Sequence, residues 1–563
     1  MNWTLTALGL LPLVGALVVV LVGDRLARTV GLVVSLLALA LAGWVAAAHL
    51  GGTDLGVQVP WIPTIGAWWA LDVDGLGLTM VALTVLLTPV VLLASWRAED
   101  RRGGASEGVL AGALGRGRAA GSSSADGNDA LGAGPRPGVA ATALADRPDV
   151  AERETGGEDR PQPRRWGARA FFALVLALEG FALLAFLTTD VLLFFLLFDA
   201  ILLPMYFLIG AFGGTHRKRA ASRFLIFALG GGLIMLASVI GLYVVSARAG
   251  APSFLVADLA ALDLGGDLGR WLFAGFFIAF AVKAPMVPVH SWLPDAAEES
   301  NPATAALLVG ILDKLGTFGM IRFCLGLFPE ASLWATPVVL VLALVSIIYG
   351  ALAAIGSKDL MRLIAFTSIS HFGFIVLGIF AWTSQSMTGS ILYMLNHGFS
   401  TAALFLVVGY LVKRRGSRSV DAFGGVQKVA PVLAGLLLFA GLSSLALPGL
   451  SSFVSEFLVL SGTFSRYPAV AAVATLGIVL AALYILIMYQ RTMTGPLTED
   501  VRARVGRDLG TRERWSLAPL VLLIIVLGFF PAPVLDVIAP TVTATLEGAG
   551  VADPVPPLGQ EAN

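Results

Sequence analysis

Lys283 stands in the apolar run FAGFFIAFAVKAPMVPVHSWLP, which is long enough to cross a bilayer. An ammonium group near the bilayer centre costs at least ~2.5–3.5 kcal/mol, so such residues face a bundle interior and mark an ion or proton path. Pro285 and Pro288 follow directly and break the helix. A membrane tolerates such a break only where protein or a water-filled cavity satisfies the freed backbone groups. A buried titratable group beside a broken helix predicts a transporter.

Other ionisable side chains also lie within apolar stretches, namely Glu179, Asp199, Lys314, His371, His397 and Glu456. Ionisable residues spread over half a dozen helices are typical of a proton relay. A plainer role is open for some of them, since Glu179 and Asp313 could satisfy local backbone groups and His371 could cap a polar cluster. His290 follows the break near one end of its span, which favours a structural role. The plain interpretation is weakest for Lys283, Lys314 and Glu456, because these three lie deep in their spans.

Glu456 has a helix break of its own. In GLSSLALPGLSSFVSEFLVL, Pro448 and Gly449 stand about two turns before it, among serines that can satisfy loosened backbone. The spans of Lys283 and Glu456 therefore share one plan, and they lie five spans apart. An odd number of spans per unit reverses the orientation of the second unit, which predicts inverted repeats.

The composition requires a membrane. The chain is 57% hydrophobic and 13% charged, with a mean hydropathy of +0.85. Lys plus Arg and Asp plus Glu both number 37, so no charge excess indicates a nucleic-acid partner. The single cysteine, Cys324, cannot ligate an iron–sulfur cluster alone or close an internal disulfide. The N-terminus lacks a basic n-region and a cleavage site, and we interpret it as the first membrane helix.

About fourteen apolar stretches of roughly 20 residues follow one another. They lie near residues 4–23, 30–48, 74–95, 169–188, 191–212, 223–246, 270–289, 303–326, 333–354, 360–382, 387–412, 431–461, 468–490 and 516–537. The prediction is an all-α polytopic membrane protein with two inverted five-helix repeats, in which the seventh and twelfth helices are broken. Alternate loops carry the cations, at 24–28, 97–169, 216–223, 358–362, 413–418 and 491–514. The positive-inside rule makes these loops cytoplasmic and both termini external.

Five segments resemble one known family: AVKAPMVPVHSWLPDA, LDKLGTFGMIRF, SKDLMRLIAFTSISHFG, LNHGFSTAALFLVVGYL and LALPGLSSFVSEF. Together, and in this order, they resemble the subunit M family of bacterial NADH:quinone oxidoreductase (respiratory complex I). These are antiporter-like subunits, equivalent to mitochondrial chain 4 and related to Mrp-type Na⁺/H⁺ antiporters. The resemblance is strong over about residues 169–495 and implies fourteen helices with inverted repeats. It also implies the membrane of a bacterial cell.

The resemblance implies a role for each buried ionisable residue. Lys283 matches the lysine of the broken seventh helix, the central protonation site, and Lys314 matches the bridging lysine of the eighth. His371 and His397 match polar residues on the path to the second half-channel. Glu456 matches the terminal acid of the twelfth helix, where sister and Mrp subunits generally carry lysine. The absence of a long lateral helix after the last span argues against subunit L.

Two features depart from the family. The fifth helix usually carries glutamate where this chain has Asp199, so the contact with Lys283 is expected to be longer or bridged by water. Glu179 is a candidate to share that task, and with His290 it is an accessory site. The segment 97–168, rich in Gly, Ala, Arg and Ser, is usually short in the family. Its composition predicts a disordered cytoplasmic loop, with a docking strip for a partner as the alternative.

The predicted organisation has five parts. Three transmembrane helices occupy residues 1–96, and the loop follows at 97–168. The first antiporter-like repeat covers 169–330, and the second, inverted repeat covers 331–495. Residues 496–563 hold a cytoplasmic loop, the last transmembrane helix and a C-terminal tail.

The expected function is proton translocation driven by quinone reduction in other subunits. Moving one charge against ~150 mV costs about 3.5 kcal/mol, which making or breaking one buried ion pair can supply. Lys283 is expected to change protonation as Asp199 approaches or withdraws, and to pass the proton through Lys314, the histidines and water to Glu456. No cofactor is expected in this chain, because NADH, flavin, iron–sulfur clusters and quinone belong to partner subunits. The expected partners are other complex I subunits, especially L and N, and the lipid bilayer.

Three alternatives remain at this stage. An Mrp-type cation/proton antiporter subunit would use the same groups, and an inert membrane scaffold would use none of them. A redox enzyme in its own right is disfavoured, because the sequence has no dinucleotide fingerprint after a strand and no metal-ligand cluster.

Overall fold

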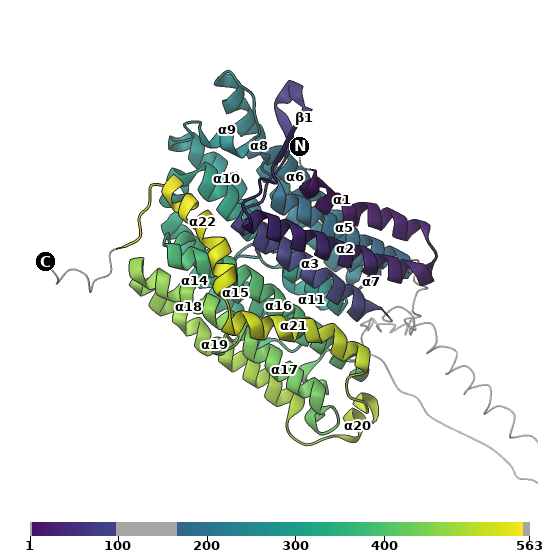
Figure 1. The fold of residues 1–563 in the computed structure, drawn as a ribbon. Helices are drawn as coiled ribbons and strands as arrows, with labels where there is room; N and C mark the ends of the chain where they lie inside the picture. The colour runs from purple at the N-terminus through teal and green to yellow at the C-terminus, as the bar shows by residue number, and fades with distance from the viewer. Residues whose placement is uncertain (1–2, 97–165, 555–563) are drawn as a thin grey trace, which may run out of the picture. The chain divides into compact units, whose positions relative to one another are not determined.

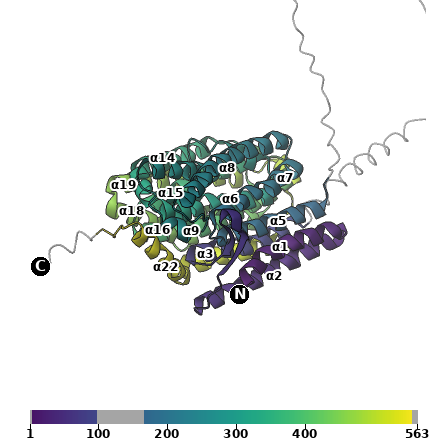
Figure 2. The same ribbon diagram turned by 90° about the horizontal axis from the view of Figure 1, so that it is seen from above.

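The computed structural model describes residues 3–96 and 166–554. Nearly all of the predicted loop 97–168 lies outside the described residues. Two apolar helices, α1 (Thr4–Leu21) and α2 (Asp24–Leu50), begin the chain, and α3 (Gly75–Ser95) follows them after a hairpin. Figure 2 shows α1 and α2 side by side with α5 (Ala168–Leu187), against which both pack.

The hairpin is a departure from the predicted all-α class. Strand β1 (Val57–Ile62) pairs antiparallel with β2 (Ala67–Leu71) across the short 3₁₀ turn η1 (Pro63–Ile65). The register runs from Val57 opposite Leu71 to Ile62 opposite Ala67, with a bulge between Pro60 and Ile62. The segment is too short to span a membrane and lies between two helices that are long enough, so it is an extramembrane cover.

Five units make the first predicted repeat. They are α5; α6 (Val191–Ala200) with α7 (Leu202–Phe212); α8 (Arg217–Arg248); α10 (Gly266–Lys283) with α11 (Trp292–Glu299); and α12 (Pro302–Leu307) continued by η2 (Leu308–Leu312), α13 (Lys314–Gly319) and η3 (Met320–Leu325). The short helix α9 (Val256–Ala260) lies in the connection before α10.

The second predicted repeat has the same plan. Its helices are α14 (Pro329–Gly356), α15 (Leu360–Phe380), α16 (Ser384–Arg415), α17 (Pro431–Ser444) with α18 (Ser451–Arg466), and α19 (Pro468–Met493). Two 3₁₀ turns, η4 (Val420–Ala422) and η5 (Val426–Lys428), precede α17. The third helix of each repeat, α8 and α16, has 32 residues, and the fourth helix of each is broken.

The first break has its backbone groups satisfied by neighbours. The α10 helix stops at Lys283, and α11 begins at Trp292, beyond Pro285 and Pro288. The indole of Trp292 donates to the carbonyl of Val282 at 2.9 Å, and the amide of Val287 donates to the Ser346 hydroxyl at 3.0 Å. These bonds replace the helical ones that the prolines remove.

The second break lies between α17 and α18. Gly449 there has φ +88°, a left-handed conformation that glycine adopts without steric cost. The amide of Asn396 on α16 donates to the carbonyl of Ser451 at 2.7 Å. Both predicted helix breaks are thus present, and each is stabilised by a side chain from another helix.

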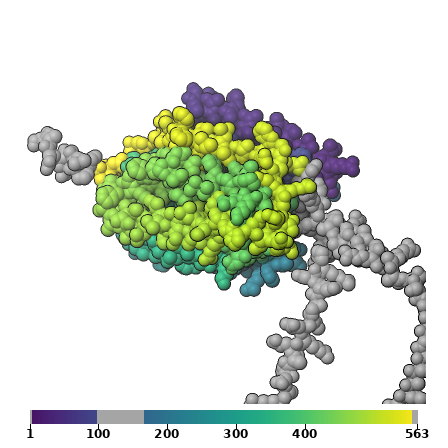
Figure 3. All heavy atoms as spheres, turned by 90° about the horizontal axis from the view of Figure 1, so that it is seen from below, coloured from purple at the N-terminus to yellow at the C-terminus, as the bar shows by residue number. Residues whose placement is uncertain are grey.

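The chain ends in α20 (Glu499–Val505), α21 (Thr511–Phe529) and α22 (Ala532–Gly548). The predicted last span over 516–537 contains a break, because the helix ends at Phe529 and resumes beyond Pro531 with a bend of 71°. Pro531 lacks the amide that would continue the helix. Both halves pack on α3 and α16 (Figure 1), and Figure 3 shows the C-terminal half, green to yellow, gathered on one face.

Within residues 3–96 and 166–554, eleven helices are long and apolar enough to cross a membrane, or twelve with the bent pair α21–α22. The seventh and twelfth predicted spans are not among the eleven because each is interrupted. The prediction of fourteen spans adds these two broken helices and stays a prediction.

Candidate functional site

Lys283 points into the protein and not into lipid. Its side chain is only 1% exposed, and its Nζ donates to the carbonyl of Phe198 on α6 at 3.0 Å. The ammonium also lies 4.0 Å from the centre of the Phe198 ring, a cation–π distance. The break fixes this position, because Lys283 is the last residue of α10.

Asp199 makes no direct ion pair with Lys283 in the described residues, and the longer or water-bridged contact expected from its shorter side chain stays a prediction. The two interact electrostatically, but among the described residues no Asp199 oxygen lies within 4.0 Å of Lys283 Nζ. The carboxylate lies against Gly232 on α8, where a Cβ would stand 2.3 Å from Oδ1. Gly232 therefore makes room for this carboxylate. The physical reason for the missing pair is reach, since aspartate is one methylene shorter than glutamate and its neighbour Phe198 supplies the acceptor instead.

Lys314 begins α13, directly after Asp313 and the π-helical segment η2. Its Nζ donates to the carbonyl of Val309 at 2.9 Å and lies 2.6 Å from Nδ1 of His397 on α16. A second π-helical segment, η3, follows α13. Such segments are rare and occur frequently at functional sites, since their wider turns leave carbonyls such as that of Val309 available to side chains.

His371 on α15 continues the line of polar groups. Its ring centre lies 5.2 Å from that of His397 and 5.9 Å from that of Tyr393. Its Nε2 is 3.2 Å from the hydroxyl of Tyr484 on α19. Two imidazoles at this spacing can exchange a proton through one intervening water or a ring rotation.

Glu456 closes the line. Its side chain is 4% exposed, and its Oε2 accepts a 3.1 Å hydrogen bond from the hydroxyl of Tyr393. Tyr393 stands four residues before His397, on the same face of α16. The structure thus brings together Lys314, His397, His371, Tyr393 and Glu456 in one buried row.

This row runs through the most buried part of the protein. The most apolar stretches of the α12–η3, α15 and α16 spans are wholly buried, and these carry Lys314, His371 and His397 respectively. Buried polar atoms are costly unless paired. Several in the row lack a hydrogen-bond partner among the described residues, including His371 Nδ1, His397 Nε2 and Glu456 Oε1. Unpaired polar atoms of this kind can bind internal water, and a chain of such atoms and water can pass protons along.

The two accessory residues lie outside this row. Glu179 on α5 is fully buried, and neither carboxylate oxygen has a hydrogen-bond partner within the described ranges. His290 lies in the first break, with its ring 4.9 Å from that of Tyr349. In the described ranges neither forms a hydrogen bond or ring contact with the lysines or histidines of the row.

Sequence reasoning missed Tyr393 and Tyr484, and it set Asp313 aside as a local pairing group. Tyr393 could have been found from its i, i+4 spacing to His397. Asp313 could have been found because it is a carboxylate directly before the buried Lys314. The sequence alone favours the simpler interpretation that it pairs with local groups. Tyr484 gives no signal, because a tyrosine in an apolar helix is ordinary.

Charged residues of the basic loops meet at the opposite end from the hairpin. Asp295 on α11 pairs with both Arg223 and Arg362, and Arg418 pairs with Glu299 at 3.2 Å. These pairs join loops that the sequence placed on one side of the membrane. These salt bridges position α11, directly after the first break.

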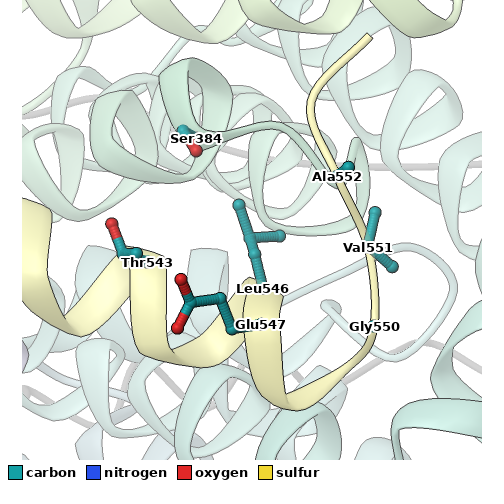
Figure 4. Close-up of a pocket in the computed structure, with 7 residues that line it drawn as sticks. All are labelled: Ser384, Thr543, Leu546, Glu547, Gly550, Val551 and Ala552. Carbon is teal, nitrogen blue, oxygen red and sulfur yellow. The ribbon is translucent and has the colours of Figure 1, made fainter.

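An open pocket of about 420 Å³ lies near the C-terminus, away from the buried row. In Figure 4, Thr543, Leu546 and Glu547 project from α22 toward the segment of Ser384. The described part of the chain contains no group of three His, Cys, Asp or Glu side chains that could hold a metal ion.

Comparisons with known proteins agree with this arrangement. A family model described as NADH:quinone oxidoreductase/Mrp antiporter, transmembrane, matches residues 188–481. NADH-quinone oxidoreductase subunit M of Mycobacterium tuberculosis is 47% identical over 98% of this chain and 95% of its own length. Subunit M of Escherichia coli K12 is 32% identical over 85% of this chain and 82% of its own.

Solved structures give the same picture. Respiratory complex I from Thermus thermophilus contains a chain with a TM-score of 0.78 and 28% identity, covering 97% of this chain and 100% of that one. The Mrp complex from Dietzia has one with a TM-score of 0.75 and 21% identity, covering 98% of this chain and 100% of that one. At that identity the second likeness concerns the fold alone.

Proposed function

This chain belongs to the subunit M family of NADH-quinone oxidoreductase, and on that premise we propose that its buried Lys, His, Tyr and Glu side chains carry the proton. It is a membrane subunit of a proton-pumping complex in which electrons pass from NADH to quinone in other subunits. The observation that carries the proposal is the 2.6 Å contact between Lys314 Nζ and His397 Nδ1 in the otherwise apolar core.

The proposed path begins at Lys283 and ends at Glu456. A proton released by Lys283 protonates the neutral amine of Lys314, which then donates to Nδ1 of His397. The imidazolium of His397 releases its Nε2 proton toward His371, and the proton reaches Glu456 through Tyr393 and water. Each step moves one proton from a donor to a lone pair. His397 is left with its proton on Nδ1 and regains the Nε2 tautomer by rotation of its ring or exchange with water, and Lys283 takes up a new proton before the next cycle.

We propose that the position of the Asp199 carboxylate controls whether Lys283 is protonated. In this structure Lys283 binds the Phe198 carbonyl, one residue before Asp199. A movement of α6 or of the Asp199 side chain away from Gly232 would bring the carboxylate to the ammonium. That contact stabilises the charged lysine, and its loss favours proton release.

We propose that the basic loops are cytoplasmic and that both termini are external. The pairing of Arg223, Arg362 and Arg418 with acids on and near α11 supports one common side for these loops. The amide of Ser384 and a carboxylate of Asp553, near the C-terminus, meet at 2.8 Å on the side of the other loops. Tagging each terminus and testing protease access in right-side-out and inverted vesicles checks this orientation.

The proposed partners are the other complex I subunits, with the antiporter-like subunits L and N as neighbours in the membrane. Large apolar side chains are exposed along α1, α2, α14 and α19, for example Leu17, Leu37, Val338 and Val479. Such faces need lipid or another membrane protein. Cross-linking of the native complex from α1 and α19 tests which subunit covers each face.

An Mrp-type antiporter subunit is the second candidate, favoured by the fold likeness to the Mrp complex. Glu456 argues against this candidate, since the family comparison made from the sequence implies that Mrp subunits generally carry lysine at this position. Purifying the chain from its native membrane decides between them. Co-purification with the NADH-oxidising subunits supports the first proposal, whereas co-purification with Mrp components contradicts it.

Proton pumping by the assembled complex tests the path directly. Lys314→Ala and His397→Ala should each leave the complex assembled but lower NADH-driven proton uptake into inverted vesicles. Normal pumping by both variants would contradict the proposed path.

A further inference from the structure

Asp313 is a buried carboxylate that the path above does not use. Its side chain is wholly inaccessible, and neither oxygen has a hydrogen-bond partner in the described part of the chain. An isolated ionised carboxylate in such a place is strongly unfavourable unless cations compensate it. Asp313 interacts electrostatically with Lys314 and Lys283, so both lysines act on the same acid.

The packing of α13 places Asp313 near both lysines. Gly316 is one helical turn beyond Asp313 and packs tightly on the end of α10, since a Cβ on Gly316 would stand 2.6 Å from Phe280 O and Ala284 N. Lys314, directly after Asp313, reaches His397 on α16. Asp313 thus adjoins Lys314 in the chain, stands one turn from the contact with α10 and interacts electrostatically with Lys283.

The backbone at this point is also unusual. The amide of Asp313 donates to Leu308 O, five residues back, at 3.1 Å. This π-type bond ends η2 and shifts the register of the helix by one residue just before Lys314. In a regular α-helix the side chains after residue 312 would be rotated, so the wide turn sets the directions of both Asp313 and Lys314.

We propose that the Asp313 carboxyl group is the proton carrier between Lys283 and Lys314. The ammonium of Lys283 gives its proton to the carboxylate, leaving a neutral amine and a carboxylic acid. The acid then gives the proton to the amine of Lys314, which becomes an ammonium, and the carboxylate is restored. Internal water bridges any gap in either step. This inference rests on the proposed function of the two lysines as proton sites.

The test uses the complete complex in native membranes, with Asp313→Asn, Asp313→Glu and Lys283→Ala. Thr317→Val is the matched control, since it removes a buried polar group from the same helix without changing charge. Proton uptake and NADH oxidation are measured together. Asp313→Asn should lower proton uptake at least about tenfold, in line with loss of a proton-transferring side chain. Asp313→Glu should retain most of the uptake, and Thr317→Val should retain nearly all of it.

Infrared difference spectra between resting and NADH-treated complex report the protonation of carboxyl groups directly. A purely structural role of Asp313 would not change these spectra. The wild type should show a carboxylic acid band that Asp313→Asn lacks and that Asp313→Glu shifts. Should Asp313→Asn fail to assemble, the shifted band in the pumping Asp313→Glu complex supports the proposal, and an unshifted band overturns it. Normal uptake by Asp313→Asn also overturns it, as does a Glu variant as inactive as the Asn variant.

The two proposals fail differently. If Lys283→Ala abolishes uptake while Asp313→Asn pumps normally, only the carrier role of Asp313 is wrong. If Lys283→Ala itself pumps normally, the proposed function is wrong.

Discussion

Lys314 Nζ and His397 Nδ1 lie 2.6 Å apart, on helices whose most apolar stretches are wholly buried. Lysine and imidazole can share one proton at this distance, and we propose that the contact is a transfer step between the two predicted repeats. When Lys314 is an ammonium it donates to Nδ1, and His397 then carries its own proton on Nε2. The Nε2 atom faces the next part of the row, where the ring of His371 lies 5.2 Å away, centre to centre.

Because the two groups act one after the other on the same path, the losses of pumping caused by their substitutions should not be additive. Lys314→Ala and His397→Ala should each cut pumping strongly, and the double variant should be little worse than either single one. Proton uptake by inverted vesicles at matched complex content measures this. Fully additive losses would show that the two residues serve separate paths.

Tyr393→Phe removes one hydroxyl and leaves the ring packing intact. A hydrogen bond to a charged group contributes about 1.5–3 kcal/mol, which corresponds to a rate change on the order of ten- to a hundredfold. We expect slower proton transfer to Glu456 and an assembled complex of normal stability. Tyr484→Phe is the comparison, since its hydroxyl meets His371 and not Glu456. A larger effect at Tyr484 would place the main route there.

Gly232→Ala should act on Lys283 without touching it. The added methyl group would stand 2.3 Å from Asp199 Oδ1 and must displace that carboxylate. Pumping should fall in Gly232→Ala, which holds the carboxylate away from its resting place, and also in Asp199→Asn, which removes its charge, because each prevents the carboxylate from alternately approaching and leaving Lys283. Asp199→Glu, with its longer reach, should pump well. Gly230→Ala on the same helix meets nothing within 4 Å and is the control. An inactive Gly230 variant would mean that α8 tolerates no added methyl group.

Asp74, the residue directly before α3, links the start of α3 to the end of the span that η3 completes. It caps α3 by accepting from the amide of Gly77 at 2.8 Å and pairs with Arg322 at 2.7 Å. Burial raises the pKa of Asp74, but the charge of Arg322 and the hydrogen bonds of Gly77, Arg322 and Thr541 outweigh it, so the net pKa is lowered.

A lowered pKa means that the stabilisation is present above the unfolded value, about 3.9, and is lost as pH falls through the folded value. Asp74→Ala should therefore reduce the heat resistance of the complex at pH 7, by about 0.5–2 kcal/mol for the cap. Thermal unfolding at pH 7 and near pH 3 measures this, and the difference between variant and wild type should shrink at the acid end. A difference that grows on acidification would contradict the assignment.

Much of the arrangement follows from sequence because membranes constrain it. Lys283, Lys314, His371, His397 and Glu456 could be placed in buried spans since lipid excludes charge, and the two breaks follow from proline and glycine. Their roles in translocation stay predictions.

The remaining features depend on tertiary packing, which hydropathy does not encode. The sequence predicts a long or water-bridged contact between Asp199 and Lys283, but it does not show that the Phe198 carbonyl accepts the hydrogen bond of the ammonium. Tyr393 became visible only once α16 lay beside Glu456 on α18. The hairpin of β1 and β2 was missed because its Trp and Pro residues interrupt a short alternation.

The most direct measurement is the number of protons pumped per electron by the assembled Lys283→Ala complex. Our account predicts a clear fall in this ratio while electron transfer to an added quinone acceptor persists in uncoupled membranes. A wild-type ratio in a complex verified to carry the substitution would contradict the central role of Lys283.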